Sequence, residues 1–314
     1  MLLDIVALVA GLVALVFAGD KLVEGSVALA ERLRISALVI GLTIVAFGTS
    51  APELFVSLSA AFDNQPGLAI GNVVGSNTAN VLLVLGAPAL IAAVKCHEDG
   101  VEVSNWAMVG LTAIFMVMLA LGGIGRLEGA FLFALLLAFI GYQLHAARKG
   151  RLPAPDYADE VDSEGLTKRG IAIALVIGVL GLAIGSELTV GGASGLAAAF
   201  GVSDAVIGLT VVAIGTSLPE LVTSVTAALK RSNEVAIGNV IGSNIFNIAS
   251  IMGITAMVVP LPVSDPRIVQ VDMWVMAATT ALLVVLTLTR GTIGKAGGAA
   301  MLLAYAVYLA LFAA

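Results

Sequence analysis

Two short segments of the chain place a proline and a glutamate inside apolar sequence. They read GTSAPE from Gly48 to Glu53 and GTSLPE from Gly215 to Glu220. An ionisable side chain deep in a bilayer costs about 2.5–3.5 kcal/mol on insertion scales, so each glutamate is a candidate functional group. Proline has no backbone N–H, so the carbonyl about four residues earlier loses its helical hydrogen-bond partner. The two segments therefore predict two broken helices that face one shared ion site.

Other oxygen-bearing side chains share helix faces with these glutamates, because residues four apart lie on one side of a helix. Thr49 precedes Glu53 by four, and the same spacing relates Ser76 to Asn80. The second half repeats both pairs, and a serine lies three before each glutamate. The predicted ligands are the side chains of Glu53, Glu220, Thr49, Ser50, Ser76, Asn80, Thr216, Ser217, Ser243 and Asn247 and the carbonyls of Ala46 and Ala213.

Every atom in this set is oxygen, which suits a hard cation such as Ca²⁺ with its six to eight oxygen ligands. Neither His nor Cys belongs to it. Two alternatives remain open. Single hydroxyls in spanning helices often bond their own backbone or a neighbouring helix, and the glutamates could form a structural buried pair. Asn72, Asn77, Asn239 and Asn244 are expected to bond backbone groups at the helix breaks rather than the ion.

Composition places these motifs in a membrane protein. The 314 residues are 60% hydrophobic and only 11% charged, whereas soluble domains carry about 25% charged residues. One cysteine excludes an intrachain disulfide. No basic stripe indicates nucleic acid.

The chain also repeats itself. After a shift of 167 residues, residues 48–86 match 215–253 at 19 of 39 positions without a gap. Apolar runs of about 20 residues are typical of spanning helices. Ten are predicted, at 2–30, 36–62, 67–93, 103–124, 127–147, 170–198, 204–229, 234–260, 269–289 and 293–313. We expect a five-helix repeat over 1–147, a cytoplasmic linker over 148–169 and a second five-helix repeat over 170–314.

Basic residues predict the orientation of the repeats. Twelve Lys and Arg lie in loops after odd-numbered helices and two in loops after even-numbered ones. The positive-inside rule then places the odd loops in the cytoplasm and both termini outside. Since the first repeat starts outside and the second inside, the sequence predicts an all-α integral membrane protein of two inverted repeats. Broken helices 2/7 and 3/8 would form its ion-binding core.

The paired motifs GTSxPE and GNxxGSNxxN resemble the α-repeats of the sodium/calcium exchanger family, within the cation/Ca²⁺ antiporter superfamily. The resemblance covers essentially the whole chain and implies a compact prokaryotic exchanger without a cofactor. It places the family's cation ligands on the same twelve residues. It also implies that helices 1 and 6 slide across a core of helices 2, 3, 7 and 8.

The expected function is therefore Na⁺/Ca²⁺ antiport by alternating access in the cell membrane, by a multi-pass protein that works as a monomer. Some relatives, notably the K⁺-dependent ones, carry Asp where this chain has Asn247, so no K⁺ co-transport is expected. The proton-coupled branch usually has GNxxE in place of GTSxPE, and H⁺/Ca²⁺ (or other divalent cation) antiport remains the alternative. An intramembrane hydrolase lacks a His or Lys base in either motif, and a passive channel would need a filter-like loop.

Overall fold

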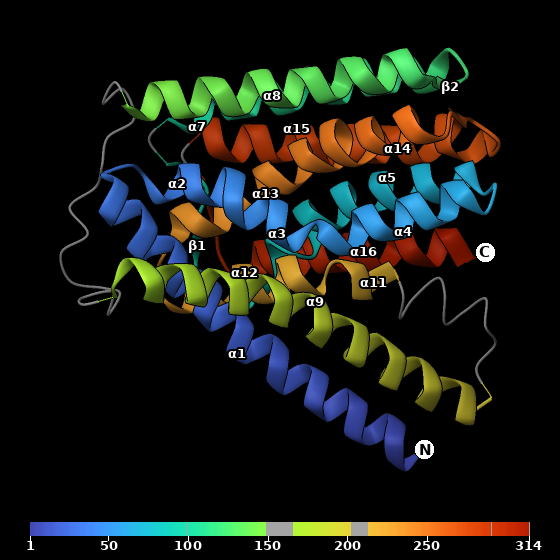
Figure 1. The fold of residues 1–314 in the computed structure, drawn as a ribbon. Coiled ribbons are helices and arrows are strands. Elements are labelled where there is room, and N and C mark those ends of the chain that lie inside the picture. The colour runs from blue at the N-terminus through green and yellow to red at the C-terminus, as the bar shows by residue number, and fades with distance from the viewer. Residues whose placement is uncertain (99, 149–165, 202–212, 290, 314) are drawn as a thin grey trace.

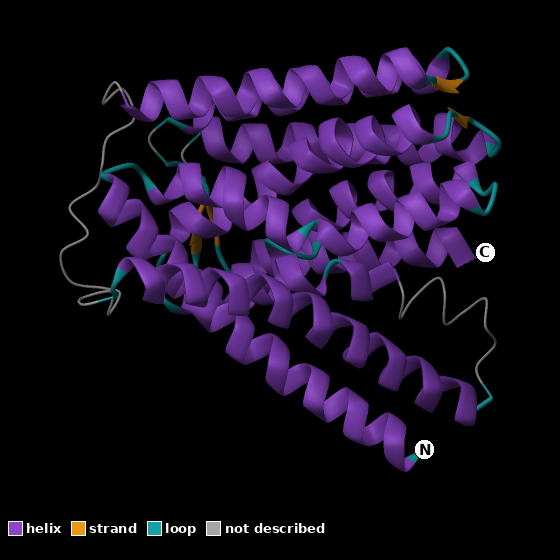
Figure 2. Cartoon of the chain, in the orientation of Figure 1, coloured by secondary structure: helices purple, strands orange, loops and turns teal. Residues whose placement is uncertain are grey.

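The computed structural model describes the chain apart from residues 99, 149–165, 202–212, 290 and 314. The described part is helical, with two pairs of very short strands (Figure 2). Its first half contains α1 (Leu2–Leu33), α2 (Ala37–Ile40), the π-helical turn η1 (Gly41–Val45), α3 (Ala46–Thr49), α4 (Ala51–Phe62), α5 (Pro66–Leu82), α6 (Gly86–Ile91), β1 (Val94–Lys95), α7 (Val101–Ala120), β2 (Gly123–Ile124) and α8 (Arg126–Arg148). Its second half contains α9 (Lys168–Ala199), α11 (Ala213–Thr216), α12 (Leu218–Leu229), α13 (Asn233–Phe246), η3 (Asn247–Met252), α14 (Gly253–Val258), β3 (Leu261–Pro262), η4 (Ile268–Asp272), α15 (Met273–Leu288), β4 (Thr292–Ile293) and α16 (Lys295–Ala313).

Many of these helices are long and apolar enough to cross a bilayer. Among the described residues seven pass on length and composition, or eight when the bent segment formed by 37–49 and 51–62 is taken as one span. Helices α12 and α16 are apolar but shorter. The structure therefore confirms an all-helical, multi-pass architecture. The start of the helix predicted at 204–229 and most of the linker predicted at 148–169 lie outside the described residues.

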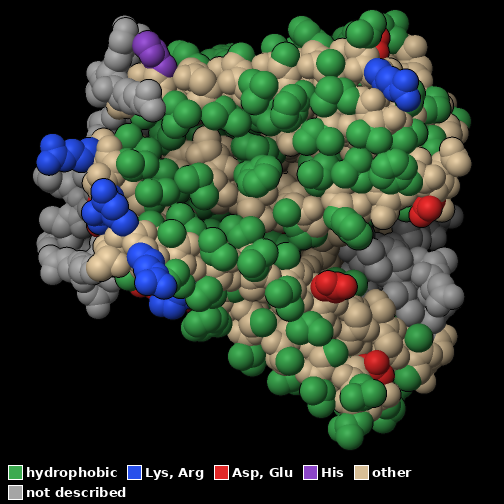
Figure 3. Space-filling view, viewed as in Figure 1, with side chains coloured by type: hydrophobic (Ala, Val, Ile, Leu, Met, Phe, Trp, Pro, Cys, Tyr) green, Lys and Arg blue, Asp and Glu red, His purple; other side chains and the backbone are tan. Residues whose placement is uncertain are grey.

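Most charged side chains in this view lie toward the two ends of the bundle, with mainly apolar side chains and one acidic group between them (Figure 3). Lys and Arg gather at the end where α8 ends and α9 begins (Figures 1 and 3). The first residue of α1 and the last turns of α16 lie at the opposite end (Figure 1). An apolar belt between two charged ends is the arrangement that a bilayer requires.

The sequence duplication has a structural counterpart in the turns that follow α4 and α12. Asn64 and Arg231, which are 167 residues apart, both take a left-handed backbone with φ of 56°. The next amide in each case, of Gln65 and Ser232, donates to a carbonyl five residues back at 2.8 Å. This is the Schellman type of helix end, which satisfies carbonyls left free by the last turn. The chain runs in opposite directions through α4 and α12 (Figure 1).

Two helices form a pair along one side of the bundle. Helices α1 and α9 pack against each other along most of their length and diverge together from the remaining helices (Figure 1). Small residues allow this approach: a Cβ at Gly178 of α9 would lie 2.8 Å from the Cα of Leu22 in α1. Close backbone contact through glycine is typical of helix pairs in membranes.

The core beside this pair is built from α2–α5 and α12–α14. Helix α13 is buried over nearly all its length, and the continuous segment of α2 and η1 approaches it at two glycines. A Cβ at Gly238 would lie 2.8 Å from the carbonyl oxygen of Leu38, and one at Gly242 would lie 2.8 Å from the Cα of Leu42. The GNxxG motif of the second half thus brings backbones of the two halves together. For Gly71 and Gly75 of the first half, the described residues leave a Cβ without any neighbour within 4 Å.

Candidate cation-binding site

Both proline motifs break their helix at a serine. Helix α3 ends at Thr49 and α4 begins at Ala51, with a bend of 44° between the two helical segments. The connecting residue Ser50 has φ −84° and ψ 8°, and Ser217 has almost the same values, −87° and 4°. Proline is compatible with the first turn of a helix, where its missing N–H has no intrahelical partner. The sequence therefore restarts a helix at each break.

The two glutamates occupy the first turns of these restarted helices, α4 and α12. A helix N-terminus favours negative charge because its free N–H groups point toward it. Glu53 and Glu220 are each only 1% exposed and lie close enough for their charges to interact. Of the described Lys, Arg and His residues, none forms a salt bridge with either carboxylate. Within the described part of the chain, the site thus holds two buried carboxylic side chains without a salt-bridged cation.

Hydrogen bonds join the two halves at this point. The Ser50 hydroxyl donates to Oε1 of Glu220 at 3.1 Å. The neighbouring Thr49 hydroxyl donates to Oδ1 of Asn239 at 3.1 Å. All four residues are buried. The first GTSxPE motif is therefore in direct contact with the glutamate and with the GNxxG motif of the other half.

Each helix break is also fixed within its own half. Asn72 donates through Nδ2 to the carbonyl of Glu53 at 3.1 Å and to the Ser57 hydroxyl at 3.0 Å. Asn239 makes the matching bonds, to the carbonyl of Glu220 at 3.3 Å and to the hydroxyl of Ser224 at 3.2 Å. The prediction that these two asparagines satisfy backbone groups is confirmed. Their side chains hold the start of α4 against α5 and that of α12 against α13.

Four more asparagines connect α5 with the junction of α13 and η3. Asn80 donates through Nδ2 to Oδ1 of Asn244 at 3.1 Å, and Asn247 donates to Oδ1 of Asn77 at 2.9 Å. Asn77 in turn donates to the backbone carbonyl of Asn244 at 3.4 Å. We refer to Asn77, Asn80, Asn244 and Asn247 as the amide network. Sequence reasoning assigned Asn77 and Asn244 to the backbone and missed their contacts with Asn247 and Asn80.

Several predicted ligand atoms are left without a partner in the interior. Within the described part of the chain, six of them are buried and make no hydrogen bond: Oε2 of Glu53, Oδ1 of Asn80, Oγ of Ser217, Oε2 of Glu220, Oγ of Ser243 and Oδ1 of Asn247. Buried polar atoms are nearly always satisfied in folded proteins, so such a group of exceptions points to a missing partner. Of the remaining predicted side chains, Ser76 is 5% exposed and Thr216 is 9% exposed.

The two predicted backbone ligands are the carbonyls of Ala46 and Ala213. The Ala46 carbonyl accepts the Ser50 N–H at 3.1 Å and the Thr49 hydroxyl at 3.4 Å. The break at Pro52 therefore does not free this carbonyl, contrary to our expectation. The helical hydrogen bonding continues as far as the Ser50 N–H, two residues before the proline, and the helix bends after Ser50. The side chain of Ala213 lies outside the described residues, and its backbone begins α11.

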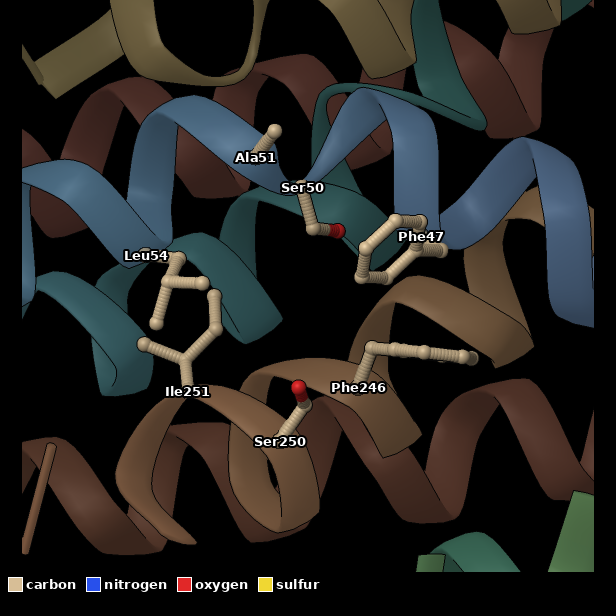
Figure 4. A pocket seen from close by; sticks show the side chains of 7 residues that line it. All are labelled: Phe47, Ser50, Ala51, Leu54, Phe246, Ser250 and Ile251. Atoms are coloured by element: carbon tan, nitrogen blue, oxygen red, sulfur yellow. The ribbon is translucent and has the colours of Figure 1, made fainter. Parts of the chain in front are cut away.

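A small hollow leads from the bundle surface to this region (Figure 4). Phe47, Ser50, Ala51 and Leu54 line it from one half, and Phe246, Ser250 and Ile251 line it from the other. The hydroxyls of Ser50 and Ser250 face each other across the hollow (Figure 4). At one side the Phe47 and Phe246 rings approach with their centroids 6.0 Å apart. Ser50, which lines the hollow, also donates to Glu220, so one hydrogen bond connects the wall of the hollow with a buried carboxylate.

An all-helical bundle with two unneutralised carboxylates and a group of unpartnered oxygens in its interior defines a membrane protein that handles cations. Comparison with known proteins specifies the class. The model of the sodium/calcium exchanger protein family matches residues 3–145 and 170–314. The chain belongs to this family, and it is a membrane transporter rather than an enzyme.

Individual proteins agree with this assignment. The inner membrane protein YrbG of Escherichia coli is 33% identical, over 99% of this chain and 97% of its own length. The sodium/calcium exchanger MaX1 of Methanosarcina acetivorans is 32% identical, over 96% of each chain. Among solved structures, the sodium-calcium exchanger NCX_Mj is 31% identical and superposes with a TM-score of 0.84 over 99% of this chain and 98% of that one.

Proposed function

We propose that the protein exchanges Na⁺ for Ca²⁺ across the cell membrane and that the twelve predicted residues form its cation site. The observation that carries the proposal is the pair Glu53 and Glu220, which are buried together and form no salt bridge with any Lys, Arg or His that the structure describes. Uncompensated charges in a protein interior are strongly unfavourable. One Ca²⁺ would neutralise both carboxylates, and the unpartnered oxygens of Asn80, Ser243 and Asn247 would complete its shell.

Sodium would compete for the same charge. Two Na⁺ ions balance two carboxylates as well as one Ca²⁺ does, and the hydroxyls of Thr49, Ser50, Thr216 and Ser217 offer further ligands. Since either load neutralises the site, both cannot occupy it at once, which is the condition for antiport. The relatives named for sodium/calcium exchange support this choice of ions, as do solved structures of NCX_Mj soaked with Na⁺ and Ca²⁺.

The architecture we propose for this exchange has ten spans in two inverted repeats, with α1 and α9 sliding across the core to alternate access. Opposite chain directions in α4 and α12 support the inversion. Helix α1 meets α12 at a residue without a side chain: a Cβ at Gly19 would lie 2.8 Å from a methyl carbon of Val222 and 3.2 Å from the Thr226 hydroxyl. We further propose that one chain is sufficient for transport and that both termini lie outside the cell.

The test is ⁴⁵Ca²⁺ uptake into proteoliposomes under imposed gradients. An outward Na⁺ gradient should drive uptake in the wild-type protein, and a pH gradient in Na⁺-free buffer should not. Glu53→Gln should abolish the Na⁺-driven signal, while Glu128→Gln, a change in the first turn of α8, should leave it intact.

Uptake driven by the pH gradient and indifferent to Na⁺ would replace this proposal with H⁺/Ca²⁺ antiport. Near-normal uptake by Glu53→Gln would instead reject the site. Calcium flux that needs no counter-ion gradient would identify a channel.

A further inference from the structure

The amide network contains two asparagines outside the proposed ligand set, Asn77 and Asn244. Both are 1% exposed, and each is the partner of a proposed ligand from the other half of the chain. Asn247 donates to Asn77, and Asn80 donates to Asn244. The pairs are related by the same shift of 167 residues that relates the two halves. This reciprocity suggests a common role rather than two separate packing contacts.

The direction of these bonds determines how the ligand amides point. A side-chain amide has a donor end and an acceptor end, so engaging the nitrogen turns the oxygen the other way. Asn80 and Asn247 each commit Nδ2 to the partner asparagine, and each leaves a buried Oδ1 with no partner. The free end of both amides is thus the end that can coordinate a cation.

Asn77 and Asn244 are themselves held in one orientation. Asn77 directs Nδ2 to the carbonyl of Asn244 at 3.4 Å and to the sulfur of Met276 at 3.9 Å. Asn244 directs Nδ2 to the sulfur of Met108 at 3.7 Å. With their donors used in this way, both residues present an oxygen to the amide of the opposite half. Such an acceptor requires a donor in front of it.

We propose that Asn77 and Asn244 are positioning residues: each orients the ligand amide of the opposite half so that its oxygen faces the cation. The inference rests on the proposed function, because it needs a cation between Glu53 and Glu220. It assigns a cross-connected pattern, with Asn77 acting through Asn247 and Asn244 acting through Asn80. The neighbours on the same helix, Asn77 with Asn80 and Asn244 with Asn247, are not the functional pairs.

Double-mutant cycles on Ca²⁺ affinity distinguish this pattern from general packing. Purified protein in detergent is titrated with Ca²⁺ by calorimetry. Asn77→Leu, which removes the acceptor, should weaken Ca²⁺ binding about tenfold, the scale of one lost orienting hydrogen bond. In the Asn247→Ala background, Asn77→Leu should lower Ca²⁺ affinity less than about twofold, because the amide that Asn77 orients is already absent. In the Asn80→Ala background, Asn77→Leu should still lower Ca²⁺ affinity by its full factor.

The mirror cycle provides an independent repetition. Asn244→Leu should lose its effect in Asn80→Ala and keep it in Asn247→Ala. Thr78→Val is the matched control: Thr78 is fully buried on the same helix and donates to the Val74 carbonyl at 3.0 Å. This variant should retain wild-type affinity. Asn77→Ala and Asn244→Ala serve where leucine prevents folding, as judged by a monodisperse elution peak.

The outcomes separate the two proposals. Wild-type protein that binds no Ca²⁺, or Glu53→Gln that binds it normally, would overturn the proposed function and this inference with it. Normal wild-type binding that Glu53→Gln abolishes, combined with additive costs in the cross-connected pairs, would overturn the positioning role alone. Coupling between Asn77 and Asn80, or between Asn244 and Asn247, as large as that in the cross-connected pairs would also overturn the positioning role.

Discussion

Replacing Glu220 by glutamine tests whether the site selects its cargo by charge. The side chain is 1% exposed and accepts the Ser50 hydroxyl at Oε1. Glutamine has the same shape, and its amide oxygen can still accept that hydrogen bond. The substitution therefore removes one negative charge and replaces the predicted ligand atom Oε2 by an amide nitrogen, while the shape of the side chain is kept. A loss of binding then reports on charge and coordination rather than on packing.

The expected magnitude follows from that charge balance. With Ca²⁺ bound, the wild-type site is neutral, whereas the Glu220→Gln site carries one excess positive charge in the interior. Leaving a buried charge uncompensated costs about 3–5 kcal/mol, which corresponds to a loss of Ca²⁺ affinity of about 10²- to 10³-fold or more. A single Na⁺ would still balance the remaining Glu53. We therefore expect Na⁺ binding to fall far less than Ca²⁺ binding.

The measurement is ⁴⁵Ca²⁺ binding to purified protein, with Na⁺ affinity read from competition in the wild type and from Na⁺-dependent thermal stabilisation in the variant. Glu234→Gln is the control. Glu234 is a partly buried carboxylate of α13 that accepts the Ser36 hydroxyl at 2.9 Å and the Leu38 N–H at 3.2 Å, outside the proposed site. Removal of the Glu234 charge should leave Ca²⁺ affinity unchanged. Equal losses of Ca²⁺ and Na⁺ binding in Glu220→Gln would refute the charge-balance reasoning.

Three further predictions concern a buried thiol, a helix cap and the independence of transport from K⁺. Cys96 is fully buried after β1, and burial raises the pKa of its thiol to about 11; the reactive thiolate is therefore scarce at neutral pH and increases as the pH rises toward that value. Maleimide labelling at pH 7 should be slow in folded protein and fast after denaturation in detergent; rapid labelling of the folded protein would contradict the burial. Ser36 caps α2 by accepting the Leu38 N–H at 3.0 Å, so Ser36→Ala should cost about 0.5–2 kcal/mol of stability. The melting temperature should fall while Ca²⁺ affinity stays constant, and a changed affinity would mean that this cap is coupled to the site. Finally, Na⁺-driven ⁴⁵Ca²⁺ uptake should not change when K⁺ is replaced by choline, because Asn247 adds no third carboxylate; a requirement for K⁺ would show that the two glutamates alone do not set the cargo.

Sequence reasoning was most successful where a local pattern determines the result. Apolar runs and prolines predicted most described helices to within a few residues, since hydrophobic length and the missing proline N–H act locally. The burial of Glu53 and Glu220 also followed from their apolar surroundings. That these residues bind the cation stays a prediction. The effect of the break on the backbone was harder to predict: the Ala46 carbonyl, which we expected to be freed, keeps the Ser50 N–H as its partner.

Contacts between the halves could not be read from periodicity. Helical spacing shows which residues share a face, and it placed Asn80 and Asn247 with their serines. It does not show which residue of another helix lies opposite. The bonds from Asn247 to Asn77 and from Ser50 to Glu220 depend on how the two halves cross. A signal was nonetheless present: the asparagine three positions before each ligand asparagine recurs in both halves, and an approximate two-fold axis would bring such repeated residues together.

Buried side-chain atoms without a hydrogen-bond partner can indicate either a binding site or imperfect packing. Within the described residues, the buried side-chain atoms without a partner also include atoms outside the proposed ligand set, such as the hydroxyls of Ser26 and Thr255 and Oδ1 of Asn105. A hydroxyl can rotate to donate to a carbonyl of its own helix, so its isolation is easily relieved. An ionised carboxylate has no hydrogen to donate, and the amide oxygens of Asn80 and Asn247 have their nitrogens already engaged. Asn105, outside the proposed site, shows the same amide pattern, so an unpartnered amide oxygen alone does not identify a cation site. The two buried glutamates distinguish the proposed site. Under the proposed function, one cation between Glu53 and Glu220 would supply the partner that these oxygens from both halves lack.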